Sequence, residues 1–102
     1  MRFGLSELVI SELLAVFSRH ANIDRVLIFG SRAKGNYREG SDIDLAVQGK
    51  GLNYSELQQL RIEIDDLEML YSVDLLDYSA VDNTPIREHI DRVGQVFYQA
   101  NM

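Results

Sequence analysis

The 102-residue chain contains no cysteine, no tryptophan, one proline and two histidines. The absence of cysteine excludes disulfide bonds and thiolate metal sites. His20 and His89 lie far apart in the sequence and no HExxH pattern occurs, so a structural zinc site is not expected either. These absences remove the disulfide-bonded and zinc-dependent classes of small protein from consideration.

Long apolar runs and net positive charge are missing as well. No apolar run approaches the roughly 20 residues of a membrane span, and the N-terminus lacks the basic stretch and apolar core of a secretory signal. We therefore expect a soluble, cytoplasmic protein. The formal net charge of −6 argues against direct nucleic-acid binding, which depends on Lys and Arg neutralising phosphates. Residues 30–40 are an exception to the negative net charge, because they contain three basic residues and one acidic residue: Arg32, Lys34, Arg38 and Glu39. A small positive patch of this kind suits a nucleotide better than a duplex.

The length of the chain leaves room for one domain, 1–102. A hydrophobic content of 46% is enough for a modest core. The residue patterns predict a helix of about 15 residues after Ser6, a strand at 25–29, a short helix at 31–34, a strand at 42–48, a helix from 55 to about 70, a strand at 72–76, a helix from Pro85 and an edge strand at 95–99. The expected fold class is α/β (α+β): a small mixed β-sheet flanked by helices, in the order α-β-α-β-α-β-α-β.

The predicted helices have start signals and apolar faces. Ser6 can cap the first helix, whose apolar positions include Leu8, Leu13, Val16 and Phe17. A capping box at 55–58 opens the long helix, and its buried stripe comprises Leu57, Leu60, Ile64, Leu67 and Tyr71. Pro85 occupies the first position of the last helix, whose apolar face comprises Ile86, Ile90 and Val93.

Asp42 and Asp44 are two carboxylates one residue apart, and they follow the glycine-serine turn GSRAKG at residues 30–35. Residues i and i+2 of a strand project from the same face, so both carboxylates should point together. Their repulsion must be relieved by a shifted pKa or by a bound cation, and Mg²⁺ prefers oxygen ligands and leaves positions open for phosphates. Taken alone, the two aspartates are also compatible with solvated carboxylates on an exposed strand face.

Gly30 allows a sharp turn and a close approach of the backbone to a ligand. The hydroxyl of Ser31 can donate to a phosphate oxygen or simply cap a helix. Taken alone, this pair fits an ordinary strand-to-helix turn, and a P-loop is excluded because no GK[ST] follows. The joint pattern G-S-x-A-x-G followed by S-D-x-D-L is far more specific, and it predicts a site for a metal–triphosphate complex.

A two-metal site needs more oxygen ligands than two aspartates supply. The segment VDLLD at 73–77 offers Asp74 and Asp77, which differ in parity and so face opposite sides of a strand. We favour Asp74, which stands between two apolar residues. Asp77 is better suited to end the strand or to cap a turn at Ser79.

The combination GSRAKG…SDIDL…VDLLD resembles the DNA polymerase beta-type nucleotidyltransferase superfamily, specifically its minimal nucleotidyltransferase (MNT) branch, over nearly the whole chain. The resemblance implies that Gly30 and Ser31 hold the phosphates of a nucleotide, with Arg32 preferred to Lys34 as the accompanying basic residue. It also implies three metal-binding aspartates with two Mg²⁺ ions expected beside bound ATP: Asp42, Asp44 and Asp74. Asp74 would serve as a ligand or as the base for the attacking hydroxyl.

The resemblance further implies a partner, because MNT proteins commonly act beside a small helical HEPN protein as an antitoxin–toxin pair. In such pairs the MNT protein can transfer AMP from ATP to a tyrosine of the toxin. Ile62 and Met69 would lie about 180° from the buried stripe of the long helix. This position suits a partner surface, a second core contact or scattered exposed apolar residues.

The leading hypothesis is therefore a Mg²⁺-dependent nucleotidyltransferase, a protein adenylyltransferase that acts as an antitoxin by modifying its toxin. A binding-only antitoxin is the main alternative, although a pure binder has no need for three acidic strand positions. A small-molecule nucleotidyltransferase would need an acceptor pocket, and the sequence shows no second domain to form it. A templated polymerase is disfavoured by the net charge.

Overall fold

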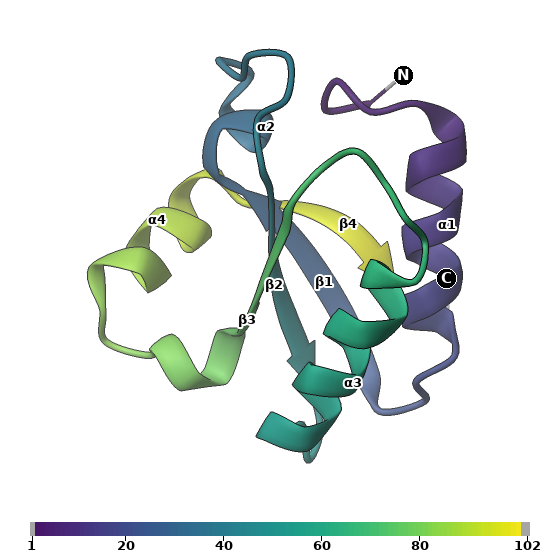
Figure 1. Cartoon of the computed structure of the whole chain (residues 1–102). Coiled ribbons are helices and arrows are strands. Elements are labelled where there is room, and N and C mark those ends of the chain that lie inside the picture. Colours follow the sequence, from purple (N-terminus) through teal and green to yellow (C-terminus); the bar gives the residue numbers. More distant parts are fainter. Residues whose placement is uncertain (1, 101–102) are drawn as a thin grey trace.

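The computed structural model describes residues 2–100 and shows a four-stranded sheet with helices on both faces (Figure 1). The elements are α1 (Glu7–Ser18), β1 (Ile23–Phe29), α2 (Gly30–Lys34), β2 (Ile43–Gly49), α3 (Tyr54–Asp65), β3 (Val73–Asp77), the 3₁₀ helix η1 (Tyr78–Val81), α4 (Pro85–Val93) and β4 (Gln95–Gln99). All expected helices and strands occur in the predicted order, and the fold class is confirmed. None of the helices within 2–100 has the length and apolar character needed to cross a membrane.

The strand order across the sheet is β3-β2-β1-β4. β1 pairs antiparallel with β2 and with β4, whereas β2 and β3 run parallel. A parallel pair needs a crossover connection, which α3 provides here. Because of this arrangement, β2 and β3 begin at the same end of the sheet, and the turn from β1 into α2 lies at that end too.

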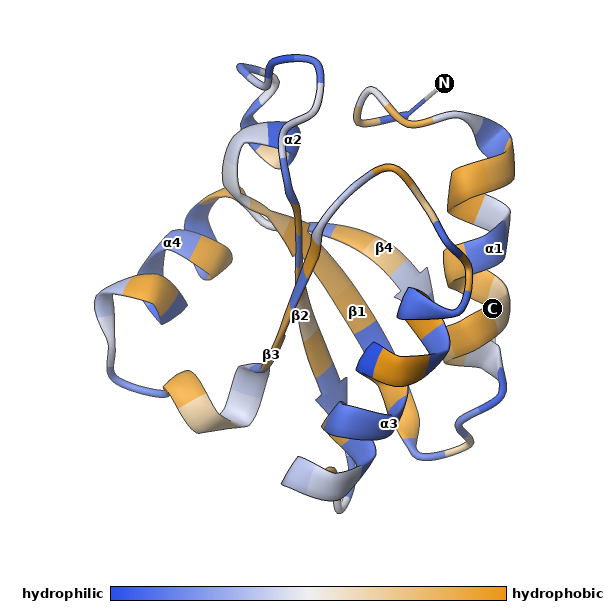
Figure 2. Ribbon diagram, in the orientation of Figure 1, coloured by the Kyte–Doolittle hydropathy of each residue, from blue (hydrophilic) through white to orange (hydrophobic). Residues whose placement is uncertain are grey.

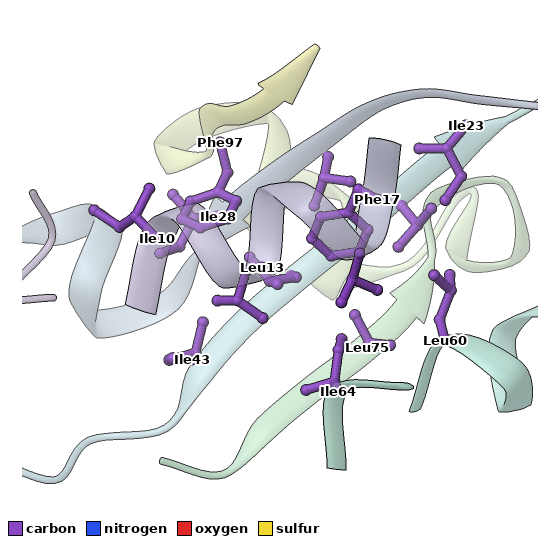
Figure 3. Packing of buried hydrophobic residues seen from close by; sticks show 14 of the residues in the cluster. Ile10, Leu13, Phe17, Ile23, Ile28, Ile43, Leu60, Ile64, Leu75 and Phe97 are labelled. Carbon is purple, nitrogen blue, oxygen red and sulfur yellow. The ribbon is translucent and has the colours of Figure 1, made fainter. Parts of the chain in front are cut away.

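The two faces of the sheet have separate apolar clusters. The larger cluster lies between the sheet and the helices α1 and α3, and Leu13, Phe17 and Leu60 are among its fully buried members (Figure 3). A smaller cluster lies on the other face, where Ile90 of α4 packs on Leu27, Phe29 and Ala46. The central strands β1 and β2 are accordingly hydrophobic along most of their length (Figure 2).

Helix α1 begins as predicted, because the side chain of Ser6 accepts a hydrogen bond from the backbone N–H of Val9. Of its expected apolar positions, Leu13, Val16 and Phe17 are buried. Leu8 is different, since 67% of its surface is exposed. The helix also has 12 residues, fewer than expected.

Helix α3 differs more from its sequence prediction. Its cap is Asn53, whose side chain accepts from the N–H of Glu56, so the predicted capping box is wrong by two residues. It ends at Asp65 rather than near residue 70. Three acidic residues crowd the predicted continuation, at 65, 66 and 68, and carboxylates are unfavourable at the negative end of a helix dipole. Consequently Met69 lies outside the helix, whereas Ile62 is on it and 55% exposed.

The remaining elements agree with expectation to within one or two residues. β2 begins at Ile43, so Asp42 lies just before the strand rather than on it. Thr84 caps α4 and Pro85 is at its first turn, as predicted. Ile90 is buried in the smaller cluster, but Ile86, expected on the same apolar face, is 40% exposed. β4 is an edge strand, as expected.

Candidate active site

The backbone register places two of the predicted site carboxylates next to each other. Asp44 on β2 is the register partner of Asp74 on β3. Register partners of neighbouring strands project to the same face of a sheet, and here that face is the one covered by α4. Asp44 is partly buried and Asp74 is exposed. The pair therefore forms a carboxylate cluster that is open to solvent on its β3 side.

The electrostatics of this cluster are unfavourable for Asp44. Burial, the negative charges of Asp74 and Asp42 and a hydrogen bond with Asp74 raise the pKa of Asp44 from its ordinary value of 3.8 to about 6, and the nearby charge of Arg32 opposes this only weakly. A carboxylate held against like charges is stabilised by protonation or by a cation. The charge of Asp42 acts on Asp44, although Asp42 itself lies exposed before the strand.

The predicted turn at Gly30 lies directly against this cluster. Gly30 follows Phe29, the register partner of Asp44, and it has a φ of +72°. A β-carbon at position 30 would meet the carboxylate of Asp44. The turn and the carboxylate can therefore pack together only because residue 30 has no side chain. Ser31 is half-buried in the first turn of α2, beside this contact.

His89 of α4 also reaches the turn, although no local motif marks it in the sequence. Its Nε2 accepts a hydrogen bond of 3.2 Å from the backbone N–H of Gly30, and its ring packs edge-on against Phe29. The cap residue of α2 is Phe29 itself, whose side chain offers no acceptor. His89 thus satisfies a backbone donor at the start of α2 that would otherwise need water or a ligand.

Arg32 has an environment that its sequence position does not reveal. Its side chain is buried, with 3% exposed, and it donates two hydrogen bonds to the carbonyl of Ser41, at 3.1 and 2.8 Å, and one of 2.8 Å to the carbonyl of Phe3. The guanidinium also lies over the rings of Tyr37 and Tyr71. These contacts favour a role in holding the Ser41–Asp42 backbone. Direct contact of Arg32 with a nucleotide stays an untested prediction.

Asp77 and Lys34, which the sequence offered as alternatives to Asp74 and Arg32, lie elsewhere in the structure. Asp77 ends β3, and its carboxylate accepts from the N–H of Ser79, as the sequence indicated. Its register partner is Val47, three residues along β2 from Asp44. Lys34 is exposed at the end of α2. The structure therefore gathers Gly30, Asp44 and Asp74 at one point and leaves Asp77 elsewhere.

Comparison with known proteins identifies the family. A model of the family described as polymerase beta nucleotidyltransferases matches residues 11–102. The chain belongs to this nucleotidyltransferase family. A relative from Methanocaldococcus jannaschii, named "Putative protein adenylyltransferase", is 31% identical over 71 residues, which cover 69% of this chain and 74% of the relative.

Solved structures agree with this assignment. A "putative minimal nucleotidyltransferase" has a TM-score of 0.69 and 28% sequence identity, and the match covers 93% of this chain and 95% of that one. A chain from the complex of a tri-AMPylated Shewanella oneidensis HEPN toxin with an MNT antitoxin has a TM-score of 0.68, with 94% and 74% covered. At 18% identity the second likeness shows the fold alone.

The donor set of this nucleotidyltransferase suits a hard cation. Every candidate ligand at the site is a carboxylate oxygen, and the raised pKa of Asp44 reflects charge repulsion that a cation would relieve. Within 2–100, no three His, Cys, Asp or Glu side chains converge closely enough to hold a metal by themselves. Mg²⁺ is commonly bound by one or two carboxylates together with substrate phosphates rather than by a complete protein cage. The site therefore fits a cation that arrives with a nucleotide.

Proposed function

We propose that this nucleotidyltransferase transfers AMP from ATP to a hydroxyl group of a partner protein, a HEPN-type toxin, and thereby acts as its antitoxin. The observation that carries the proposal is the pairing of Asp44 with Asp74 against the Gly30 turn. This arrangement joins a carboxylate cluster to a turn that can approach a phosphate chain closely. The AMPylated HEPN toxin found with a similar MNT fold supports a protein as the acceptor.

Asp42, Asp44 and Asp74 are the residues that would hold Mg²⁺. The bound ion would neutralise the carboxylates, offset the charge of the triphosphate and favour loss of the proton from the attacking hydroxyl. The Gly30 turn would let the triphosphate approach the backbone closely, and Ser31 would position it through its own backbone amide and hydroxyl group. Arg32 would position Asp42 indirectly, because its hydrogen bonds fix the carbonyl of Ser41, which immediately precedes Asp42.

The transfer is a displacement at the α-phosphorus of ATP. The acceptor oxygen forms a new bond to that phosphorus, and the bond from the phosphorus to the oxygen bridging to the β-phosphate breaks, so that pyrophosphate leaves with both electrons of the broken bond. The hydroxyl proton passes to a carboxylate or to water. Asp74 is the carboxylate with solvent access on the edge strand, so it is the group best placed to receive the proton.

The test uses the purified chain, the protein encoded by the neighbouring reading frame, ATP and Mg²⁺. We expect one or more AMP increments on the neighbour by intact-protein mass spectrometry. Asp44→Asn should abolish them without dissociating the two proteins. An ATP analogue with a methylene group between the α- and β-phosphates should also give no increment, because the bond that must break is absent.

A binding-only antitoxin predicts a different result. In that case Asp42→Ala and Asp44→Ala would neutralise the toxicity of the neighbour as well as the wild type does. Nucleotide binding can be measured separately. Mg²⁺ with ATP should raise the melting temperature of the wild type, and the Mg²⁺-dependent part of the shift should be smaller in Asp44→Asn.

A further inference from the structure

An apolar groove lies outside the catalytic cluster, between the start of α1 and the segment 67–71 that leads from α3 to β3. Its volume is about 340 Å³. Figure 2 shows hydrophobic residues in both of these parts of the chain. The side chains that matter most for its character are Leu8, Glu12, Glu68, Met69 and Leu70.

Two leucines of the groove are exposed to an extent that the fold does not require. Leu70 is 100% exposed and Leu8 is 67% exposed. Glu68, two residues before Leu70, has a φ of +54°, a backbone conformation that costs about 1–2 kcal/mol for a residue with a side chain. The chain thus leaves α3 through a strained residue and presents a leucine to solvent at a position where it stabilises nothing within 2–100.

The groove lies at the end of the sheet that carries the catalytic carboxylates. Tyr71 lines the groove and stacks on Arg32, with the guanidinium carbon 4.9 Å from the ring centroid. The carbonyl of Ser72 accepts a 2.9 Å hydrogen bond from the N–H of Ile43, at the start of β2. Leu70 and Asp74 are four residues apart, so their α-carbons are separated by at most about 14 Å.

The groove and the carboxylates nevertheless face different sides of the sheet. The groove is on the side of α1 and α3, whereas Asp44 and Asp74 face α4. The free edge of β3 lies between them. A folded protein seated on the groove can extend over this edge and present a hydroxyl to Asp74.

The charges around the groove indicate which protein surface would fit it. Its lining includes the carboxylates of Glu12 and Glu68 and no Lys or Arg. Glu7, in the first turn of α1, adds a further negative charge nearby. A second copy of this chain in a symmetric contact would bring these carboxylates against their own equivalents, which is unfavourable. The complementary surface is an apolar one bordered by Lys or Arg.

We propose that this groove is the docking surface for the protein acceptor, and that the acceptor binds it with aliphatic side chains flanked by basic residues. This inference rests on the proposed function, because it assigns a binding surface to the partner of the same reaction. Leu70 is the main apolar anchor and Leu8 forms the opposite wall. Glu12 and Glu68 select the charge of the partner and orient it toward Asp74.

The test measures the affinity of the chain for the protein of the neighbouring reading frame by titration calorimetry. Leu70→Asp should raise the dissociation constant by about tenfold or more, as expected for an anchor at the centre of an interface. Because Leu70 is fully exposed, this change should leave the melting temperature and its shift with Mg²⁺ and ATP unaltered. Glu12→Lys combined with Glu68→Lys should weaken binding roughly three- to tenfold, and less so at high salt.

Two control variants carry the same apolar-to-Asp change elsewhere. Tyr54→Asp alters an exposed side chain at the opposite end of α3, and we expect it to bind normally. Ile62→Asp alters the outer face of α3. Loss of affinity in Ile62→Asp with normal affinity in Leu70→Asp would overturn the proposal. Self-association of the free chain that Leu70→Asp abolishes would overturn it in favour of a second copy as the occupant.

Failure of the docking proposal is distinguishable from failure of the proposed function. If Leu70→Asp binds the neighbour as tightly as the wild type and is equally active, the groove is not the docking surface, yet transfer stands. If Leu70→Asp abolishes binding while the wild-type complex yields no AMP increment, docking stands and transfer fails. Asp44→Asn should show the reverse of Leu70→Asp: normal binding and no increment.

Discussion

Gly30 and Asp44 pack so closely that no space is left between them for one more carbon atom. Gly30 turns the chain out of β1 with a φ of +72°, and a β-carbon there would collide with the carboxylate of Asp44 on the adjacent strand. The contact joins the predicted phosphate-binding turn to the predicted metal-binding carboxylate. Both parts of the motif therefore depend on one another for their positions.

Gly30→Ala should consequently affect both stability and activity. The positive φ costs about 1–2 kcal/mol for a residue with a side chain, and the new methyl group displaces Asp44. We expect the free energy of unfolding, measured in urea, to fall by about this amount. AMP transfer should fall by more than the loss of folded protein explains.

Gly35→Ala is the matched control for this effect. Gly35 also has a positive φ, of +85°, but a β-carbon there would meet nothing within 4 Å. The Gly35→Ala variant should lose a similar free energy of unfolding and keep its activity. Equal losses of activity in the two variants would contradict a specific contact between position 30 and Asp44.

Asp44→Asn should stabilise the fold at neutral pH while it removes activity. Folding raises the pKa of Asp44 to about 6, so the charged carboxylate destabilises the native state, and this cost grows as the pH rises from about 4 through 6. A shift of two units corresponds to nearly 3 kcal/mol, but Asp44 is only partly buried and screening reduces the effect. We expect a gain of about 1 kcal/mol at pH 7–8.

The pH dependence of this gain is the decisive measurement. Below about pH 4 the carboxyl of Asp44 is protonated in both folded and unfolded states, so the advantage of Asp44→Asn should disappear. Asp24→Asn, at an exposed site on β1, should change the free energy of unfolding by less than about 0.5 kcal/mol at either pH. A gain that does not vary between pH 4 and 8 would contradict the raised pKa.

The sequence predicted those parts of the molecule that depend on local residue chemistry. The apolar runs of β1 and β2, the Ser6 and Pro85 signals and the order of the elements were all recognisable. From the joint motif we also predicted that Gly30, Asp44 and Asp74 belong to one site. The register of β2 and β3 is consistent with this prediction, because it places Asp44 beside Asp74.

Long-range contacts account for what the sequence did not reveal. His89 lies 59 residues from Gly30, and only the packing of α4 brings its ring to the turn. The burial of Arg32 depends on carbonyls of Phe3 and Ser41, which no motif connects. The exposure of Leu8 likewise depends on which segment lies beside the start of α1, and the helical spacing of α1 does not reveal this.

Arg32→Lys should destabilise the chain although it keeps the positive charge. A lysine cannot reproduce the two hydrogen bonds to the carbonyl of Ser41 or the planar contact with Tyr37 and Tyr71. A part-buried carbonyl left without its partner costs about 1–3 kcal/mol. Because a lysine can still reach one of the two carbonyls, we expect a total loss of about 2 kcal/mol. Thermal and urea unfolding measure it.

The same variant separates the positioning role of Arg32 from direct nucleotide binding. If Arg32 acts through Ser41, Arg32→Lys should impair transfer at saturating ATP, because Asp42 loses its fixed position. Lys34→Ala is the control, since Lys34 is exposed and should have little effect on stability. An increase in the KM for ATP with unchanged kcat and unchanged stability would favour direct contact with the nucleotide instead.

The last prediction concerns the third carboxylate, for which the sequence offered Asp74 and Asp77. Asp74 is the register partner of Asp44, whereas Asp77 caps η1 through Ser79. Asp74→Asn should therefore reduce AMP transfer by two orders of magnitude or more, as expected for loss of a general base or metal ligand. Its free energy of unfolding should not fall, because the change removes one negative charge from the cluster around Asp44.

Asp77→Asn should show the opposite pattern, with a modest loss of stability of about 0.5–1 kcal/mol from the weakened cap and near-normal transfer. Full activity in Asp74→Asn together with inactive but stable Asp77→Asn would assign the third position to Asp77.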